Sequence, residues 1–224
     1  MELTKRIPEP EIMDDPAQVV AYGKADFSQP HEMFVDLFQE RFPNFSKGTV
    51  IDLGCGTCDI TIRFAKRFPL TVLHGVDASL PMLNFALEQI KKNHLSNRIN
   101  LIHAKIRSDT DFPKKNYDAV IVNSLLHHLK DPMIFWTVVK KIIAPGGRLF
   151  VMDLTRPKNT KRALEIVEKY AANEPEILKR DFYNSLLAAY TLDEVSIQMK
   201  KAGLNDLIVE KVSDRHLVVW GHVT

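Results

Sequence analysis

The sequence predicts an α/β fold, a doubly wound and mostly parallel sheet of seven strands with an antiparallel last strand. Short apolar segments with strand character alternate with amphipathic segments of helical period over residues 49–153. Because right-handed crossovers join parallel neighbours, this alternation favours βαβ units around one sheet. Two further apolar segments, at about 205–212 and 215–221, are separated only by a short turn. A parallel crossover needs about a dozen residues or more, so these two strands should pair antiparallel.

The predicted elements follow in a regular order. Strands are expected at 49–53, 71–76, 99–103, 117–123 and 148–153. Helices are expected at about 31–42, 58–67, 80–93 and 192–202, with another around Phe135 to Ile142. The helix at 80–93 illustrates the pattern, because its apolar residues recur on one face of a helix, at Leu83, Ala86, Leu87 and Ile90.

Three segments lie outside this alternation. Residues 1–28 carry three prolines and are expected to be irregular; with the helix that follows, they form an N-terminal arm and cap helix over 1–48. Pro145-Gly146-Gly147 predicts a turn before the fifth strand. Two helices, at about 158–172 and 175–189, interrupt the α/β domain of 49–224. We expect this insertion, residues 156–190, to form a substrate lid; the alternative is that it merely covers apolar surface.

The overall composition excludes several classes of protein. Thirty Lys and Arg residues nearly balance 28 Asp and Glu, giving a formal charge of +2, whereas a dedicated nucleic-acid binder is strongly basic. The apolar segments are strand-sized, so we expect no membrane span and no secretory signal. The two cysteines do not form a disulfide framework, which favours a reducing compartment and a cytoplasmic location. The oligomeric state stays open.

Glycines and acidic residues follow the first two predicted strands, at the sheet edge where open parallel sheets bind ligands. In Asp52-Leu53-Gly54-Cys55-Gly56-Thr57, the glycines let a ligand approach the backbone at the start of a helix. Asp77 ends the second strand, where a carboxylate can accept hydrogen bonds from both ribose hydroxyls. On these residues alone, a nicotinamide-binding fold remains an alternative.

Four segments taken together are more specific than the loop alone. In order and spacing, VIDLGCGTCDIT, GVDASLPML, NYDAVIVNSLLHHLKD and IIAPGGRLFVMDL resemble the class I S-adenosylmethionine-dependent methyltransferases, from about Thr49 to the C-terminus. The resemblance implies methyl transfer with S-adenosyl-L-methionine as the cofactor. It also implies the residues that hold the cofactor: Asp52, Gly54, Cys55, Gly56 and Asn123 around the methionine part, Asp77, Ala78 and Met82 around ribose and adenine, and Tyr22 closing over it.

The sequence departs from the family pattern at two positions. Cys58 stands where the family commonly has a third glycine, and Ile106 where it often has an aspartate that binds the adenine amino group. We expect main-chain groups of Ile106 and Arg107 to hold adenine instead, with Asp109 as the alternative. Cys55 and Cys58 also form a C-x-x-C pair, but zinc needs further ligands and the glycine loop explains both positions. We therefore expect no metal site.

Polar residues that could act on an acceptor follow the fourth and fifth strands. His127 and His128 lie just past Asn123, and histidine titrates near neutral pH, so either could be a catalytic base, with His128 favoured; local architecture is the alternative. Other candidates are Asp153, Arg156 for an acidic acceptor, and Tyr183, Asn184 or Tyr190 in the insertion.

The run YNSLLAAYTLDEVSIQMKKAGL is similar to small-molecule methyltransferases, including those of quinone biosynthesis. We therefore expect a small-molecule acceptor. Nucleic acid is disfavoured as a partner, because Asn123 is followed by Ser-Leu-Leu and not by the Pro-Pro-aromatic signature of DNA amino-methyltransferases. The alternatives are a methyltransferase acting on protein or tRNA, a nicotinamide-dependent oxidoreductase, and a non-catalytic cofactor-binding partner.

Overall fold

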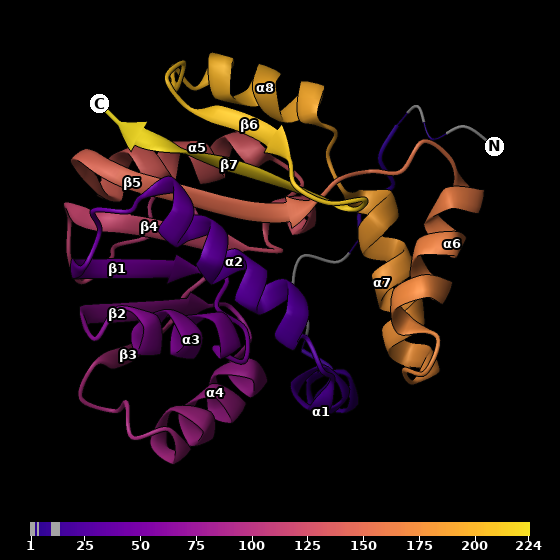
Figure 1. Cartoon of the computed structure of the whole chain (residues 1–224), viewed down its shortest axis with the longest axis horizontal. Coiled ribbons are helices and arrows are strands. Elements are labelled where there is room, and N and C mark those ends of the chain that lie inside the picture. The colour runs from indigo at the N-terminus through magenta and orange to yellow at the C-terminus, as the bar shows by residue number, and fades with distance from the viewer. Residues whose placement is uncertain (1–2, 4, 10–13) are drawn as a thin grey trace.

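A seven-stranded sheet forms the centre of the structure, a computed structural model that describes residues 3, 5–9 and 14–224 (Figure 1). Its strands are β1 (Lys47–Leu53), β2 (Leu70–Asp77), β3 (Ile99–His103), β4 (Tyr117–Asn123), β5 (Ile143–Leu154), β6 (Ile208–Lys211) and β7 (His216–Val223). They lie in the order β3-β2-β1-β4-β5-β7-β6. Strands β1 to β5 pair in parallel, and β7 is antiparallel to both β5 and β6. The predicted fold class, including the reversed last strand, is confirmed.

Helices cover both faces of the sheet. On one face lie α2 (Ser28–Arg41), α3 (Asp59–Arg67) and α4 (Leu80–Lys92); on the other lie α5 (Pro132–Ile142) and α8 (Leu192–Lys201). Each turns an apolar stripe toward the strands, which is why the periodicity of the sequence locates these helices to within a few residues.

A phenylalanine cluster fixes the cap helix α2 to the sheet. The buried ring of Phe38 forms T-shaped contacts with two other rings. The ring centroids lie 4.8 Å apart for Phe64 in α3 and 5.8 Å apart for Phe150 in β5. Such pairs add about 0.5–1.5 kcal/mol each to the free energy gained by burial. The first turn of α2 is thereby held beside the carboxyl ends of the strands, where Ser28 borders the main cavity.

The expectation that residues 1–28 are irregular is wrong for part of that segment. A helix, α1, spans Pro16–Lys24. Its N-cap is Asp15, whose carboxylate accepts hydrogen bonds from the Ala17 and Gln18 N–H groups. Pro16 stands at the first position of the helix, where a missing N–H costs nothing. Proline here starts a helix instead of preventing one.

The turn predicted at Pro145-Gly146-Gly147 lies within β5, which begins at Ile143. The chain does bend there: Gly146 has φ of +73°, and the pairing of β4 with β5 shifts register between Tyr117 and Ala119. A glycine at this φ accommodates an irregularity without ending the strand, because it carries no Cβ.

Two helices inserted after β5 stand beyond the carboxyl ends of the parallel strands (Figure 1). They are α6 (Thr160–Ala171) and α7 (Glu176–Ala188), and they pack on one another through a separate apolar cluster that includes Ile166 and Leu186. Both were expected. No helix in the described part of the chain is long and apolar enough to cross a membrane.

Candidate active site

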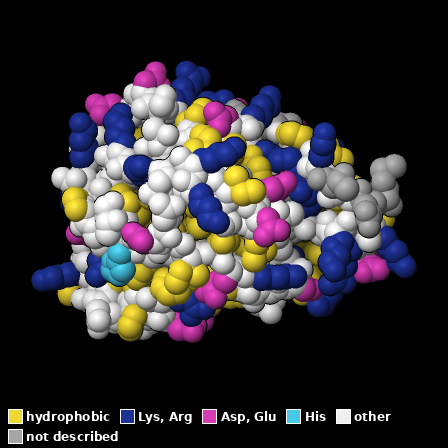
Figure 2. Space-filling model, turned by 90° about the horizontal axis from the view of Figure 1, so that it is seen from above, with side chains coloured by type: hydrophobic (Ala, Val, Ile, Leu, Met, Phe, Trp, Pro, Cys, Tyr) yellow, Lys and Arg dark blue, Asp and Glu magenta, His cyan; other side chains and the backbone are white. Residues whose placement is uncertain are grey.

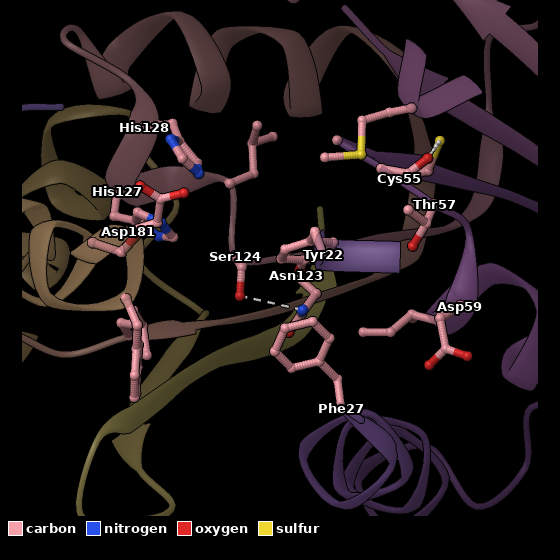
Figure 3. A pocket seen from close by; sticks show the side chains of 18 of the residues that line it. Tyr22, Phe27, Cys55, Thr57, Asp59, Asn123, Ser124, His127, His128 and Asp181 are labelled. Carbon is pink, nitrogen blue, oxygen red and sulfur yellow. Dashed lines mark hydrogen bonds between the residues drawn. The ribbon is translucent and has the colours of Figure 1, made fainter. Parts of the chain in front are cut away.

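One large cavity opens at the carboxyl ends of the parallel strands, between the sheet, α1 and α7 (Figure 3). Its volume is about 910 Å³, and it extends from the loop after β1 to a short 3-10 helix, η1 (Leu126–His128). In Figure 3, Cys55 and Thr57 lie on one side, and His127 and His128 on the other. We call these sides the loop half (residues 52–57 and 77–82) and the histidine half (Glu9 with lining residues from 124–129 and 178–185).

The loop after β1 turns its backbone toward the cavity. Gly54 and Gly56 have φ of +75° and +52°, a region that residues with a Cβ rarely adopt. A Cβ added at Gly54 would lie 2.8 Å from Leu125 Cδ1, whereas one at Gly56 would meet nothing within 4 Å. The N–H groups of Gly54 and Cys55 donate to the Val76 carbonyl at 2.8 and 3.0 Å. The loop is therefore tied to β2 while its tip stays open to a ligand.

Asp77, at the end of β2, holds this loop. Its Oδ2 accepts a hydrogen bond from the Gly56 N–H at 2.8 Å, and its Oδ1 accepts one from the Ser79 N–H at 2.8 Å. Burial raises the pKa of Asp77 above its ordinary value, and these backbone bonds oppose the shift. The carboxylate thus shapes the loop and also has acceptor capacity left for a ligand.

Carboxylates dominate the electrostatics of the loop half. Asp52 is buried and accepts a hydrogen bond from Thr61 Oγ1 at 2.5 Å; burial raises its pKa to about 7 despite that bond. Burial tends to raise the pKa of Asp59 as well. Its contacts with His31 at 2.6 Å and Arg63 at 2.8 Å outweigh this and lower the pKa to about 2. Because Arg63 is paired with Asp59, the field at the loop favours a positively charged ligand and disfavours a pyrophosphate.

Asn123 marks the boundary between the two halves. Its Nδ2 donates to Ser124 Oγ at 3.3 Å, the dashed line in Figure 3. Its Oδ1 is buried and finds no hydrogen-bond partner in the described part of the chain. Because buried polar atoms are nearly always paired, this oxygen points to a ligand with a hydrogen-bond donor.

Two stacked histidines form the wall of the histidine half, with ring centroids 4.2 Å apart. His127 Nδ1–H donates to Asp153 Oδ1 at 2.5 Å, and both side chains are 2% exposed. Asp153 Oδ2 also accepts from the Leu126 N–H at 2.7 Å, so one carboxylate fixes both η1 and the ring. Burial disfavours protonation of His127, but Asp153 and Glu9 raise its pKa overall.

The N-terminal arm docks against this wall through Arg6. Its guanidinium donates to the carbonyls of Ala188 at 2.8 Å, Leu129 at 2.8 Å and His127 at 2.5 Å, and to the hydroxyl of Tyr190. The planar fork of donors that only arginine offers can satisfy this many acceptors at once. The start of the chain is thereby fastened to η1 and to the end of α7.

Arg6 brings Glu9 into the cavity wall. Glu9 Oε1 lies 3.4 Å from His127 Nε2 and 3.3 Å from His128 Nδ1, and Ser185 Oγ donates to it at 3.0 Å. Burial raises the pKa of Glu9, although His127 and Ser185 oppose the shift. The sequence analysis missed both arm residues. Its only signal was a proline-flanked stretch that favours extended backbone.

Comparison with known proteins assigns the α/β core to a family. Residues 50–147 match the family model described as a methyltransferase domain. A demethylmenaquinone methyltransferase of Listeria welshimeri is 33% identical over 113 residues, 50% of this chain and 47% of that protein. A pavine N-methyltransferase of Thalictrum flavum subsp. glaucum is 29% identical over 117 residues, 52% of this chain and 32% of that protein.

The complete fold is shared with a solved structure, an S-adenosylmethionine-dependent methyltransferase from Aquifex aeolicus. Its TM-score is 0.68 at 17% identity, covering 95% of this chain and 100% of that chain. The chain has the fold of the class I S-adenosylmethionine-dependent methyltransferases, and its residues 50–147 match the methyltransferase domain model. It spans about half the length of the bacterial relative and about a third of the plant relative.

The structure gathers most of the residues that the resemblance implies for cofactor binding around one cavity. Those that line it are Tyr22, Asp52, Gly54, Cys55, Gly56, Asp77, Ala78, Met82, Ile106 and Asn123. Arg107 is the exception. It is exposed, it lies outside the cavity lining, and its N–H donates to Thr110 Oγ1 at 2.9 Å. The loop turns outward after Ile106, so Arg107 is not in place to hold adenine. The alternative residue, Asp109, is also exposed and outside the lining.

Of the acceptor candidates expected from the sequence, His127, His128 and Asn184 line the cavity. Asp153 does not face the cavity mouth; it holds His127. Arg156 is buried and forms two hydrogen bonds with Glu194, at 2.8 and 3.0 Å, so its charge is already compensated and does not serve an acidic acceptor.

The two tyrosines of the insertion also lie outside the cavity lining. The Tyr190 hydroxyl donates to the Leu129 carbonyl at 3.0 Å, and its ring lies under the Arg6 guanidinium, 4.2 Å from the centroid. Tyr183 packs against the apolar cluster of α6 and α7. Both side chains therefore support the insertion and the arm, because their contacts are with the protein itself.

The cysteine pair shows neither redox nor zinc character. Burial raises the pKa of the Cys55 thiol well above its ordinary value, whereas reactive cysteines have a lowered pKa. Among the described residues, one group of three or more potential metal ligands is close enough together to share an ion, and it contains Glu9, His127 and His128. The loop position explains the cysteines without further chemistry.

Proposed function

We propose that this protein transfers the methyl group of S-adenosylmethionine to a small-molecule acceptor. One observation carries the proposal: a carboxylate-lined glycine loop faces a pair of stacked histidines, one of them held by Asp153, across one cavity. The loop half fits a positively charged adenosyl cofactor. The histidine half fits an acceptor that must lose a proton.

The residues of the loop half fit each part of the cofactor. The unpartnered Asn123 Oδ1 suits the ammonium group of the methionine part, which brings the missing donor. Asp77 has acceptor sites left for ribose hydroxyls, and Ala78, Met82 and Ile106 offer apolar surface for adenine. When bound, S-adenosylmethionine supplies an electrophilic methyl group, and the electrons of the broken carbon–sulfur bond stay on sulfur.

The acceptor forms its new bond to the methyl carbon with a lone pair of oxygen, nitrogen or sulfur, or with a nucleophilic carbon. An acceptor that carries a proton on the reacting atom must release it, and the histidine half provides for this release. His128 is the more accessible of the two rings, since its side chain is 16% exposed and that of His127 is 2% exposed. Asp153 keeps the His127 ring fixed beside it.

The insertion of residues 156–190 and the N-terminal arm together form the lid of the cavity. From α7, Leu178, Asp181 and Ser185 line the histidine half. Gln18 of α1 donates to Asp181 Oδ2 at 2.5 Å and so joins the arm to the insertion, while Tyr22 lines the loop half. A closed lid excludes water from the reacting groups and fixes the acceptor in line with the methyl group.

Size and charge favour a small acceptor over a macromolecule. The volume of about 910 Å³ lies within the range of about 300–1,000 Å³ that is typical of small-molecule sites. On the face shown in Figure 2, basic side chains are interspersed with acidic ones, which offers no continuous basic track for RNA. The relatives named for demethylmenaquinone and for pavine also bear the names of small molecules.

Two measurements test this proposal. Calorimetry should show that S-adenosylhomocysteine binds and that NADH does not; a preference for NADH would refute the assignment. Turnover should then be measured against phenols, thiols, amines and quinone-like acceptors, with an unfolded protein and a bulk tRNA preparation in parallel. Methylation confined to the macromolecules would overturn the small-molecule acceptor, and cofactor binding without any turnover would indicate a non-catalytic binding partner.

A further inference from the structure

We propose that Glu9, His127 and His128 bind one divalent transition-metal ion of the Zn²⁺ type at the acceptor end of the cavity. Two imidazoles and one carboxylate form a ligand set used by catalytic zinc sites, which keep a further position open. Whether the ion binds does not depend on the proposed function. What the ion does for the reaction rests on it.

The donor atoms already have the spacing that a shared ion requires. Atoms bound to one Zn²⁺ at about 2.0–2.2 Å in a tetrahedron lie about 3.3 Å from one another. Glu9 Oε1 lies 3.4 Å from His127 Nε2 and 3.3 Å from His128 Nδ1, and the three atoms all lie within 4.8 Å of one another.

The surroundings of His127 match those of a metal-binding histidine. Such rings usually donate their second N–H to a carboxylate, which fixes the tautomer and makes the ligating nitrogen more basic. His127 Nδ1–H donates to the buried Asp153 Oδ1 at 2.5 Å, and this leaves Nε2 facing Glu9. Asp153 is thus a positioning residue for the proposed ion. A histidine that served only to fill the core would need no second carboxylate at Nε2.

The third ligand is delivered by the N-terminal arm. Glu9 is 10% exposed in its side chain, and Ser185 Oγ donates to the same oxygen that faces the two rings. The carboxylates of Glu9, Asp153 and Asp181 lie around the histidines, and they are opposed by Arg6 and by Arg180, which pairs with Asp181 at 3.1 Å. This excess of negative charge suits a divalent cation.

The position of the ion defines the class of acceptor. The histidines line the cavity beside Leu125 and Leu129, so the open coordination positions face the space left for the acceptor. A hydroxyl or thiol coordinated there has a lowered pKa and is presented to the methyl group as the anion, its proton passing to solvent. The structure therefore favours an oxygen or sulfur nucleophile that can bind a metal.

The test is a metal titration of the full-length protein after chelator treatment. Co²⁺ is added and followed by its visible absorption, and Zn²⁺ affinity is measured in competition with a chromophoric chelator. One equivalent should bind. Glu9→Gln and His128→Asn should each weaken Zn²⁺ binding by about 10-fold or more, and Asp153→Asn by about 10–100-fold with the stoichiometry unchanged. The exposed His222, whose Nδ1 contacts the Gly146 carbonyl, gives the matched control His222→Asn, which should bind like the wild type.

Two results would overturn the proposal. The first is that the wild type binds neither Co²⁺ nor Zn²⁺ stoichiometrically, and the second is that Glu9→Gln and His128→Asn bind Zn²⁺ as tightly as the wild type. The first is expected if His127 is simply an imidazolium held between Asp153 and Glu9. Calorimetry with S-adenosylhomocysteine on the same samples separates this inference from the proposed function. If S-adenosylhomocysteine binds and the metal does not, only the proposed metal site is refuted. If the metal binds and S-adenosylhomocysteine does not, only the proposed methyltransferase function is refuted.

Discussion

The two halves of the cavity are built from different parts of the chain. In the loop half, the contact between the Gly56 N–H and Asp77 joins residues 21 positions apart, within one βαβ unit. In the histidine half, the contact between Ser185 and Glu9 joins residues 176 positions apart. The first half presents mainly backbone and its carboxylates, and the second presents side chains from the arm, η1 and α7. The comparison implies that cofactor binding and acceptor chemistry can be damaged separately.

The largest effect is expected from a side chain placed in the loop half. Gly54→Val adds a Cβ that would lie 2.8 Å from Leu125 Cδ1 at a φ of +75°. Backbone strain and overpacking together cost about 2–5 kcal/mol, so calorimetry should show S-adenosylhomocysteine affinity reduced about 100-fold. Gly203→Val is the matched control, because Gly203 has φ of +72° and lies outside the cavity lining. It should lose stability and keep its affinity; equal affinity losses in both variants would contradict the assigned site.

A smaller effect is expected at the carboxylate of β2. Asp77→Ala removes the bonds to Gly56 and Ser79 as well as the proposed ribose contacts. The binding free energy for S-adenosylhomocysteine should weaken by about 1–3 kcal/mol, which is about 5–150-fold in affinity. Asp77→Asn retains one oxygen for a backbone donor and should lose less. Unchanged affinity in Asp77→Ala would place the ribose elsewhere.

The histidine half should respond in turnover and not in cofactor affinity. Arg6→Lys keeps the positive charge but cannot reach the carbonyls of His127, Leu129 and Ala188 together. The arm then holds Glu9 less firmly, and we expect kcat to fall about 10-fold, which is less than the loss of about 100-fold that a displacement of about 1 Å can cause. S-adenosylhomocysteine affinity should stay within about 2-fold of the wild type. A parallel loss of cofactor affinity would show that the two halves are not separable.

A further effect is expected in the pH dependence of stability. In the folded chain burial raises the pKa of Asp52 to about 7, whereas an unfolded aspartate titrates near its ordinary value of 3.8. Between these values the folded state binds more protons than the unfolded state, so the free energy of unfolding falls as pH rises toward 7. Asp52→Asn should remove this decline. The Tm of the cofactor-free protein should be measured at pH 5 and at pH 8. The drop in Tm between these two pH values should be smaller in the variant than in the wild type, by about 2–4 °C for each kcal/mol of pH-dependent stability that the substitution removes. An identical pH dependence would mean that Asp52 is ionised throughout.

The sequence located the loop half almost completely. Gly54, Gly56 and Asp77 lie where strands predicted from apolar runs come to an end, and parallel pairing brings the ends of β1 and β2 together in register. The same patterns predicted the helices on both faces and the antiparallel β7. The patterns failed at two elements. Helix α1 begins at a proline, and strand β5 continues through two glycines. In both places a residue usually read as a break is accommodated at a position that tolerates it.

By itself, then, the sequence determined the α/β fold, the edge of the sheet at which the cavity lies and the glycine loop that lines it. It could do so because strand and helix periods are local, and the ends of consecutive parallel strands must meet. Only the tertiary structure decided that Asp153 holds His127 and that Glu9 faces the two histidines. It also decided that Arg156 forms an ion pair with Glu194. Those contacts depend on how the arm and α7 dock on η1, and no local pattern in the chain records contacts between segments so far apart.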